Sequence, residues 1–135
     1  MSPSDDIGLQ KEFLKERYME ALAVARDMIE KGKAEELMPK EFFEFPIDAK
    51  TYLNMFGPDT KIGIFSFHDP HAKFKELSKI QCPILAFYGA VDEAVVDNKV
   101  EEALSIIKNK ATSALRCDVK LIKGASHNYI NHEKK

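Results

Sequence analysis

A short apolar run in the second half of the chain constrains the fold more than any other feature. Residues 84–88 follow Pro83 and are apolar without interruption, which is typical of a strand buried on both faces of a parallel sheet. Gly89 ends the run, and the acidic residue Asp92 follows it. We therefore expect a buried strand that ends in a loop carrying a carboxylate, at the edge where open α/β sheets gather ligands and catalytic groups.

A second stretch has the same arrangement. Residues 117–122 predict another strand, Gly124 ends it, and His127 follows. The residues between the two strands, from 97 to 112, have apolar side chains at helical spacing. Together these segments predict one βαβ unit with two parallel strands. Asp92 and His127 are then expected at the same edge of the sheet.

These two segments resemble parts of the α/β-hydrolase family. The segment from Cys82 to Asp92 has the form xPxLxxxGxxD and resembles the segment that supplies the triad acid. The segment from Lys123 to His127 resembles the xxGxxH segment that supplies the triad histidine. Their order along the chain also matches the family. The resemblance covers residues 80–130 and implies that Asp92 orients His127, which would act as the general base.

The residues before this unit are predicted to be mainly helical. Apolar spacing, capping residues and Gly or Pro stops predict three helices, over residues 9–31, 49–56 and 69–78. Asp48 is expected to cap the second of them. Because these helices do not alternate with strands, residues 7–79 resemble the helical cap that α/β-hydrolases insert between their sixth and seventh strands.

The expected fold class is therefore α/β. We predict a single partial α/β-hydrolase domain over residues 1–135, with a helical cap segment at 7–79 and a βαβ unit at 80–135. The Ser-Pro-Ser-Asp-Asp opening, the Gly-Lys-Ala-Glu-Glu-Leu-Met-Pro segment that begins at Gly32, and Phe65-Ser66 narrow the resemblance. They are similar to the group that includes the fusarinine C (siderophore) esterases.

The nucleophile that this resemblance requires has no candidate in the sequence. Such hydrolases carry a serine in a Gly-x-Ser-x-Gly turn, and the chain contains no such segment. Ser126 adjoins His127, so their side chains are expected to point apart, and the stretch from Gly63 to Ser66 has the wrong spacing. Loss of the nucleophile costs on the order of a millionfold in turnover. The chain is thus expected to be the C-terminal part of a hydrolase, inactive alone, taking an ester substrate only when completed by a nucleophile-bearing half.

Three alternatives stay open at this stage. Glu93, next to Asp92, is the other candidate for the acid. The chain could also be a non-catalytic interaction module, in which the exposed edge of the strand at 84–88 pairs with another copy to give a homo-oligomer. A small Rossmann-like or flavodoxin-like ligand binder is the third reading, although the glycines stand singly and form no phosphate loop.

Composition excludes several classes of partner. The formal net charge of -2 gives no electrostatic reason to expect nucleic acid or an anionic membrane. No apolar run approaches the roughly 18 residues that span a bilayer, so a cytoplasmic protein is expected. Cys82 and Cys117 are expected to be buried thiols, with a disulfide between them as the alternative. No zinc spacing is present, and Asp69 with His71 lacks further ligands, so neither a metal nor a cofactor is expected.

Overall fold

The chain divides into two units, each with its own apolar core. The computed structural model describes residues 3–58 and 65–128. The helical unit comprises residues 6–63, and the sheet unit comprises residues 1–5 and 64–135. The elements in chain order are α1 (Asp6–Leu14), α2 (Tyr18–Glu30), α3 (Ala49–Phe56), β1 (Ile84–Gly89), α4 (Val100–Lys110) and β2 (Cys117–Ile122). Short 3-10 turns lie at Lys15–Arg17, Leu77–Lys79 and Val96–Asn98.

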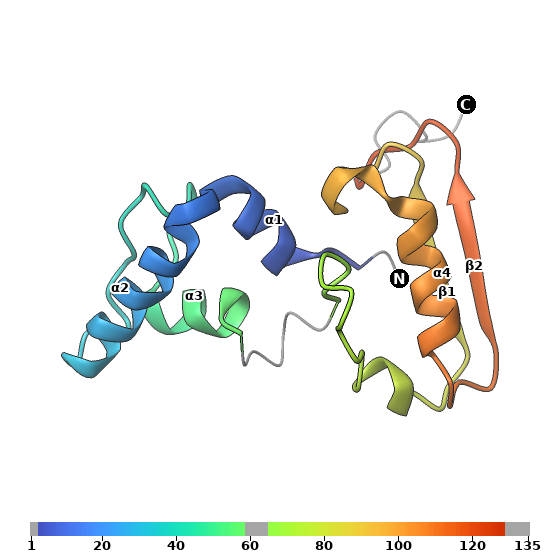
Figure 1. Ribbon diagram of the computed structural model, residues 1–135, viewed down its shortest axis with the longest axis horizontal. Coiled ribbons are helices and arrows are strands. Elements are labelled where there is room, and N and C mark those ends of the chain that lie inside the picture. The colour runs from blue at the N-terminus through green and yellow to red at the C-terminus, as the bar shows by residue number, and fades with distance from the viewer. Residues whose placement is uncertain (1–2, 59–64, 129–135) are drawn as a thin grey trace. The chain divides into compact units, whose positions relative to one another are not determined.

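The sheet unit is built on two parallel strands. β1 pairs with β2 so that Ile84 lies opposite Cys117 and Gly89 opposite Ile122. The helix α4 connects them and packs against both strands (Figure 1). These observations confirm the predicted strands, their parallel direction and the mixed α/β class. The helix begins later than predicted because Asp97 adopts a left-handed backbone conformation, with φ of 56°.

The strand β1 is buried on one face only, which corrects the expectation of burial on both. Ile84, Ala86 and Tyr88 are buried in one core with the apolar side of α4. Leu85 points to the opposite face and is 47% exposed. An uninterrupted apolar run therefore did not distinguish a strand covered on both faces from one covered on a single face.

The core of the helical unit forms where α3 packs against α1 and α2. Its aromatic part includes Tyr52 and Phe56, whose ring centroids lie 5.0 Å apart. The amide nitrogen of the buried Gln10 donates to the carbonyl oxygen of Phe42 at 2.7 Å and to the hydroxyl of Tyr52 at 2.9 Å. A buried amide that satisfies two acceptors fixes the relative position of the segments that carry them.

The helix predicted over residues 9–31 is interrupted. The 3-10 turn Lys15–Arg17 separates α1 from α2, and Lys15 has a left-handed φ of 50°. Leu14 and Tyr18 on either side of the turn are both buried, and the Tyr18 hydroxyl donates to the carbonyl oxygen of Phe56 at 2.5 Å. One continuous helix was predicted because apolar spacing persists across the break. Phe13, an apolar residue that fits the helical spacing, is 64% exposed.

The helix predicted over residues 69–78 is wrong. Asp69 accepts a hydrogen bond from the backbone N–H of His71 at 2.8 Å, which forms a turn instead of opening a helix. Phe74 has a left-handed φ of 48°, and its buried side chain packs in the core of the sheet unit. Tertiary packing of this aromatic side chain therefore outweighs the local helix signal. Residues 61–64 of the predicted cap segment and residues 129–135 of the predicted βαβ unit fall outside the residues that the structure describes.

The predicted cap of α3 is confirmed and provides a stability test. Asp48 accepts from the Thr51 backbone N–H at 2.8 Å and from its hydroxyl at 2.7 Å. These hydrogen bonds hold the pKa of Asp48 below its usual value. We expect Asp48→Ala to lower the thermal midpoint by about 4 °C at neutral pH.

The pH dependence of this difference follows from the sign of the shift. A lowered folded-state pKa stabilises the fold above the unfolded pKa of about 4, and that contribution is lost as the pH falls through the lowered value. Thermal melts of the two proteins should therefore converge in acid. Glu30→Gln, at an exposed helix end in the same unit, is the control and should show no such convergence. A difference that stays constant down to acid pH would contradict the assignment.

Candidate functional site

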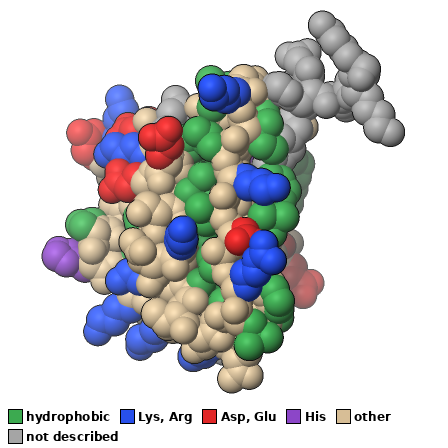
Figure 2. Space-filling view, turned by 90° about the vertical axis from the view of Figure 1, so that its right-hand side faces the viewer, with side chains coloured by type: hydrophobic (Ala, Val, Ile, Leu, Met, Phe, Trp, Pro, Cys, Tyr) green, Lys and Arg blue, Asp and Glu red, His purple; other side chains and the backbone are tan. Residues whose placement is uncertain are grey.

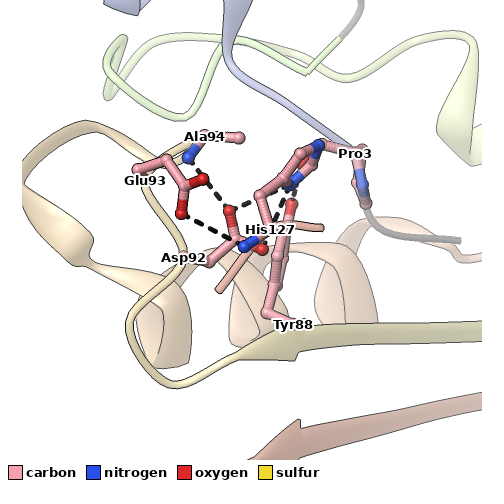
Figure 3. Close-up of polar contacts among 6 residues, drawn as sticks. All are labelled: Pro3, Tyr88, Asp92, Glu93, Ala94 and His127. Carbon is pink, nitrogen blue, oxygen red and sulfur yellow. Dashed lines mark hydrogen bonds and ion pairs between the residues drawn. The ribbon is translucent and has the colours of Figure 1, made fainter. Parts of the chain in front are cut away.

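The structure brings Asp92 and His127 together at the carboxyl ends of the two strands. Asp92 lies in the loop after β1, and His127 lies in the loop after β2. The Nδ1 atom of His127 is 3.0 Å from Oδ1 of Asp92 and 3.2 Å from Oδ2 (Figure 3). Parallel pairing of β1 with β2 is the reason, because both strands release their chains at the same edge of the sheet.

Burial sets the roles of the two side chains. The side chain of Asp92 is fully buried, whereas that of His127 is 31% exposed. Asp92 Oδ1 also accepts from the backbone N–H of Ala94 at 2.9 Å. Because a carboxylate only accepts hydrogen bonds, Nδ1 of His127 is the donor in its contact with Asp92. The pair can thus orient an imidazole for proton transfer.

Glu93, the alternative acid, contacts the backbone of His127 instead of its ring. Its Oε2 atom accepts from the His127 backbone N–H at 3.1 Å (Figure 3). Hydrogen bonds from its own backbone N–H and from that of His127 lower the pKa of the Glu93 carboxyl. Glu93 therefore helps to hold the histidine loop, and Asp92 is the acid that contacts the imidazole.

A close backbone contact positions the histidine loop against the end of β1. A Cβ atom on Gly89 would lie 2.1 Å from the carbonyl oxygen of Ala125, so only glycine fits there. The backbone N–H of Val91 donates to the same oxygen at 3.1 Å. Ala125 is fully buried, and Gly124 turns the chain after β2 with a left-handed φ of 73°. The two glycines that suggested strand ends in the sequence thus have structural roles at the site.

A second Asp–His pair was missed by the sequence analysis. Nδ1 of His68 lies 2.8 Å from Oδ1 of Asp5, and the His68 backbone N–H donates to Oδ2 at 2.7 Å. The side chain of Asp5 is almost fully buried. Its backbone N–H donates to the carbonyl oxygen of Ala94, in the Asp92 loop, at 3.1 Å. The sequence shows both residues, Asp5 in the opening segment and His68 beside Asp69. No local pattern predicts a contact between residues so far apart in sequence.

Aromatic side chains of the sheet unit pack in its core, and some of them also line a cavity. Tyr88 is fully buried in the core, and its hydroxyl donates to the carbonyl oxygen of Pro3 (Figure 3). Phe67 and Phe74 line a cavity of about 400 Å³ beside α4, to which His68 also contributes. Neither Asp92 nor His127 is among its lining residues, so the cavity is separate from the Asp92–His127 pair.

The structure also shows the surroundings of the possible metal ligands and of the two cysteines. His71 contacts Asp69 through its backbone N–H, and no group of three or more His, Cys, Asp or Glu side chains in the described ranges could hold a metal ion. Cys82 and Cys117 are both free thiols. Cys82 is exposed, contrary to the expectation of two buried thiols.

Within residues 3–58 and 65–128, no helix has the length and apolar character needed to cross a bilayer.

Comparison with known proteins places the chain in a family. The profile of the family described as "Protein of unknown function (DUF1749)" matches residues 2–135, so the chain belongs to this family. No curated protein and no solved structure matches the chain.

The contact at Gly89 makes a specific prediction. Gly89→Ala should lower the free energy of unfolding by about 3 kcal/mol, because the added methyl group meets backbone that cannot turn away. It should also shift the NMR signals of the His127 ring. Gly32→Ala is the control: its backbone φ is 75° but nothing lies within 4 Å, so it should cost only about 1 kcal/mol. Equal losses in the two variants would contradict the role of Gly89.

The tautomer of His127 gives a second prediction. In Asp92→Asn the remaining carbonyl oxygen keeps the Ala94 N–H, and the new amide donates to Nδ1, so the imidazole proton moves to Nε2. Long-range ¹H–¹⁵N NMR spectra of the ring report this change. Glu93→Gln, which alters only the backbone contact of His127, should leave the tautomer as it is. An unchanged tautomer in Asp92→Asn would show that Asp92 does not orient the ring.

Proposed function

We propose that Asp92 and His127 are the acid and the base of a hydrolase of the α/β-hydrolase class, which acts on esters or related acyl compounds. One observation carries the proposal: a partly exposed imidazole donates through Nδ1 to a fully buried carboxylate at the carboxyl edge of a parallel sheet. The order of the two residues along the chain and the segments around them support the same class. The narrower resemblance to the fusarinine C esterase group is compatible with it.

The chemistry assigned to the pair is proton transfer. Nε2 of His127 takes the proton of a serine hydroxyl as the serine oxygen attacks the acyl carbon, and then gives it to the departing alcohol oxygen. In the second half, Nε2 takes a proton from the water that attacks the acyl-enzyme and returns it to the serine oxygen. Asp92 stays ionised and stabilises the imidazolium that forms at each step.

The serine itself must be supplied from outside residues 1–135. The sequence contains no Gly-x-Ser-x-Gly segment, and among the described residues His127 forms its polar contacts with Asp92 and Glu93. We infer that another segment or another chain carries the nucleophile and the oxyanion-binding groups. Alone, the chain should not exceed the slow reaction of a free imidazole with activated esters.

A non-catalytic, oligomerising module is the second candidate function. The observation that favours it lies at the outer edge of β2, and not at the edge of the strand at 84–88: no second strand of the described residues pairs with β2 on that side. This candidate predicts assembly without any role for His127. The two candidates are therefore separated by whether a completed protein depends on His127 for turnover.

The experiment co-expresses the chain with the polypeptide encoded immediately upstream of it and measures hydrolysis of a short-chain p-nitrophenyl ester. We expect turnover that falls by about 10⁴-fold in His127→Ala and in Asp92→Asn. His71→Ala, at an exposed histidine of the same unit, is the matched control and should keep full activity.

Two outcomes would overturn the hydrolase assignment. One is turnover by the completed protein that is the same with and without the His127 imidazole. The other is an upstream region that encodes no Gly-x-Ser-x-Gly segment, with no ester hydrolysis by the co-expressed proteins. If the chain alone turns over and His127→Ala does not, the class is supported and the nucleophile lies within residues 1–135.

A further inference from the structure

The outer side of β2 carries backbone groups that can form another ladder. The backbone N–H of Ile84 donates to Arg116 and that of Ala90 to Ile122. In a parallel pair only every second residue of a strand directs its backbone N–H and C=O groups to the neighbouring strand. In β2 these are the even-numbered residues. The N–H and C=O groups of Cys117, Val119 and Leu121 therefore point away from β1. The described part of the chain provides no hydrogen-bond partner for them.

The side chains of β2 alternate between two different surfaces. Cys117 and Val119 pack toward the core beneath α4. Asp118 and Lys120 lie on the opposite face, where Leu85 is also exposed. Figure 2 views the side of Figure 1 on which β2 lies, and it shows hydrophobic side chains along this face with basic and acidic side chains among them. A strand that joins this edge must match both surfaces.

We propose that the occupant of this edge is a second copy of the chain, with the two β2 strands antiparallel and Val119 opposite Val119. Two registers pair the most residues of one β2 with the other: in one of them Val119 lies on the twofold axis, and in the other Lys120 does. A centre at Lys120 opposes two lysines, and a centre at Asp118 opposes two aspartates. The centre at Val119 instead sets Asp118 of each copy against Lys120 of the other. Opposite charges across a strand pair stabilise it, and like charges destabilise it.

This register also agrees with the hydrogen-bonding pattern. Outward-pointing backbone groups at 117, 119 and 121 meet the same positions of the second copy, so every one of them gains a partner. Asp118 and Lys120 then form the closer, non-hydrogen-bonded pairs, with Cβ atoms about 5 Å apart. Asp118 already binds Arg116 at 2.6 Å in an exposed ion pair, and Lys120 adds a second cation on its other side.

The helices show the same complementarity. The core side of α4 is formed by Val100, Ala103, Leu104 and Ile107. Helical spacing of 100° per residue then puts Glu101, Ser105 and Lys108 on one flank. Glu101 lines a surface hollow together with Leu121 of β2, so this flank faces the outer edge of the sheet. A twofold axis at Val119 makes the two α4 helices antiparallel, with Glu101 of each copy near Lys108 of the other.

The geometry of the sheet allows these helices to fit side by side. Strands lie about 4.8 Å apart, so the midpoints of the two β1–β2 pairs are separated by about 10 Å. Helices pack at interaxial distances of about 8–10 Å. The result is a continuous four-stranded sheet covered on one face by two helices, closed by a twofold axis. This dimer does not depend on the proposed hydrolase function, because Asp92 and His127 lie in loops beyond the strand ends.

The first test is disulfide crosslinking in a Cys82→Ser, Cys117→Ala background. A symmetric crosslink forms only at the residue on the twofold axis, where Cα atoms of a hydrogen-bonded pair are about 5.5 Å apart. We expect Val119→Cys to give a covalent dimer under mild oxidation, and Asp118→Cys and Lys120→Cys to give little. Preferential crosslinking at 118 or 120 would overturn the proposed register.

The second test reverses the charges and measures self-association by sedimentation velocity over a concentration series. Asp118→Lys and Lys120→Asp should each weaken the dimer by about tenfold or more, since each sets like charges opposite one another twice. The double variant should recover most of the affinity. Lys73→Asp, at an exposed loop position outside β2, is the control for net charge and should associate like the unmodified chain. A monomer at every concentration, or a double variant no tighter than the single ones, would overturn the proposal.

Discussion

The parallel hydrogen-bond ladder between β1 and β2 is the constraint on which the candidate site depends. Because the strands are parallel and in register from Ile84–Cys117 to Gly89–Ile122, their chains leave the sheet at one edge and at one level. Two loops that are far apart in sequence thereby meet, and a carboxylate and an imidazole come within hydrogen-bond distance. An antiparallel arrangement of the same strands would place these loops at opposite ends.

The loop that carries Asp92 is held from several directions. Ala94 is the common point, since its N–H donates to Asp92 and its carbonyl accepts from Asp5. Asp5 in turn binds both the backbone and the ring of His68. The buried carboxylate of Asp92 is therefore held in place by a network of hydrogen bonds that runs through Ala94 and Asp5 to His68. Such preorganisation is what a proton-transferring pair requires.

Much of the sheet unit and part of the helical unit could be predicted from the sequence. The two strands and the cap at Asp48 were predicted correctly because each has a local cause: an apolar run ended by glycine, or a side chain that accepts the first free N–H groups of a helix. The predictions failed where packing outweighed the local signal. Lys15 and Phe74 adopt left-handed backbone conformations that the neighbouring residues do not predict. Lys15 follows the end of α1 inside the predicted helix, and Phe74 lies in a segment where a helix was predicted and none forms.

The sequence by itself determined the two parallel strands, the helix between them and the two residues that follow the strands, Asp92 and His127. These depend on periodicity, glycine stops and chain order, which are properties of nearby residues. Only the tertiary structure decided the rest. The Asp5–His68 pair, the contact that requires Gly89, and the exposed outer side of β2 each depend on residues distant in sequence. Their positions follow from how the chain packs and pairs its strands, and no local pattern encodes that.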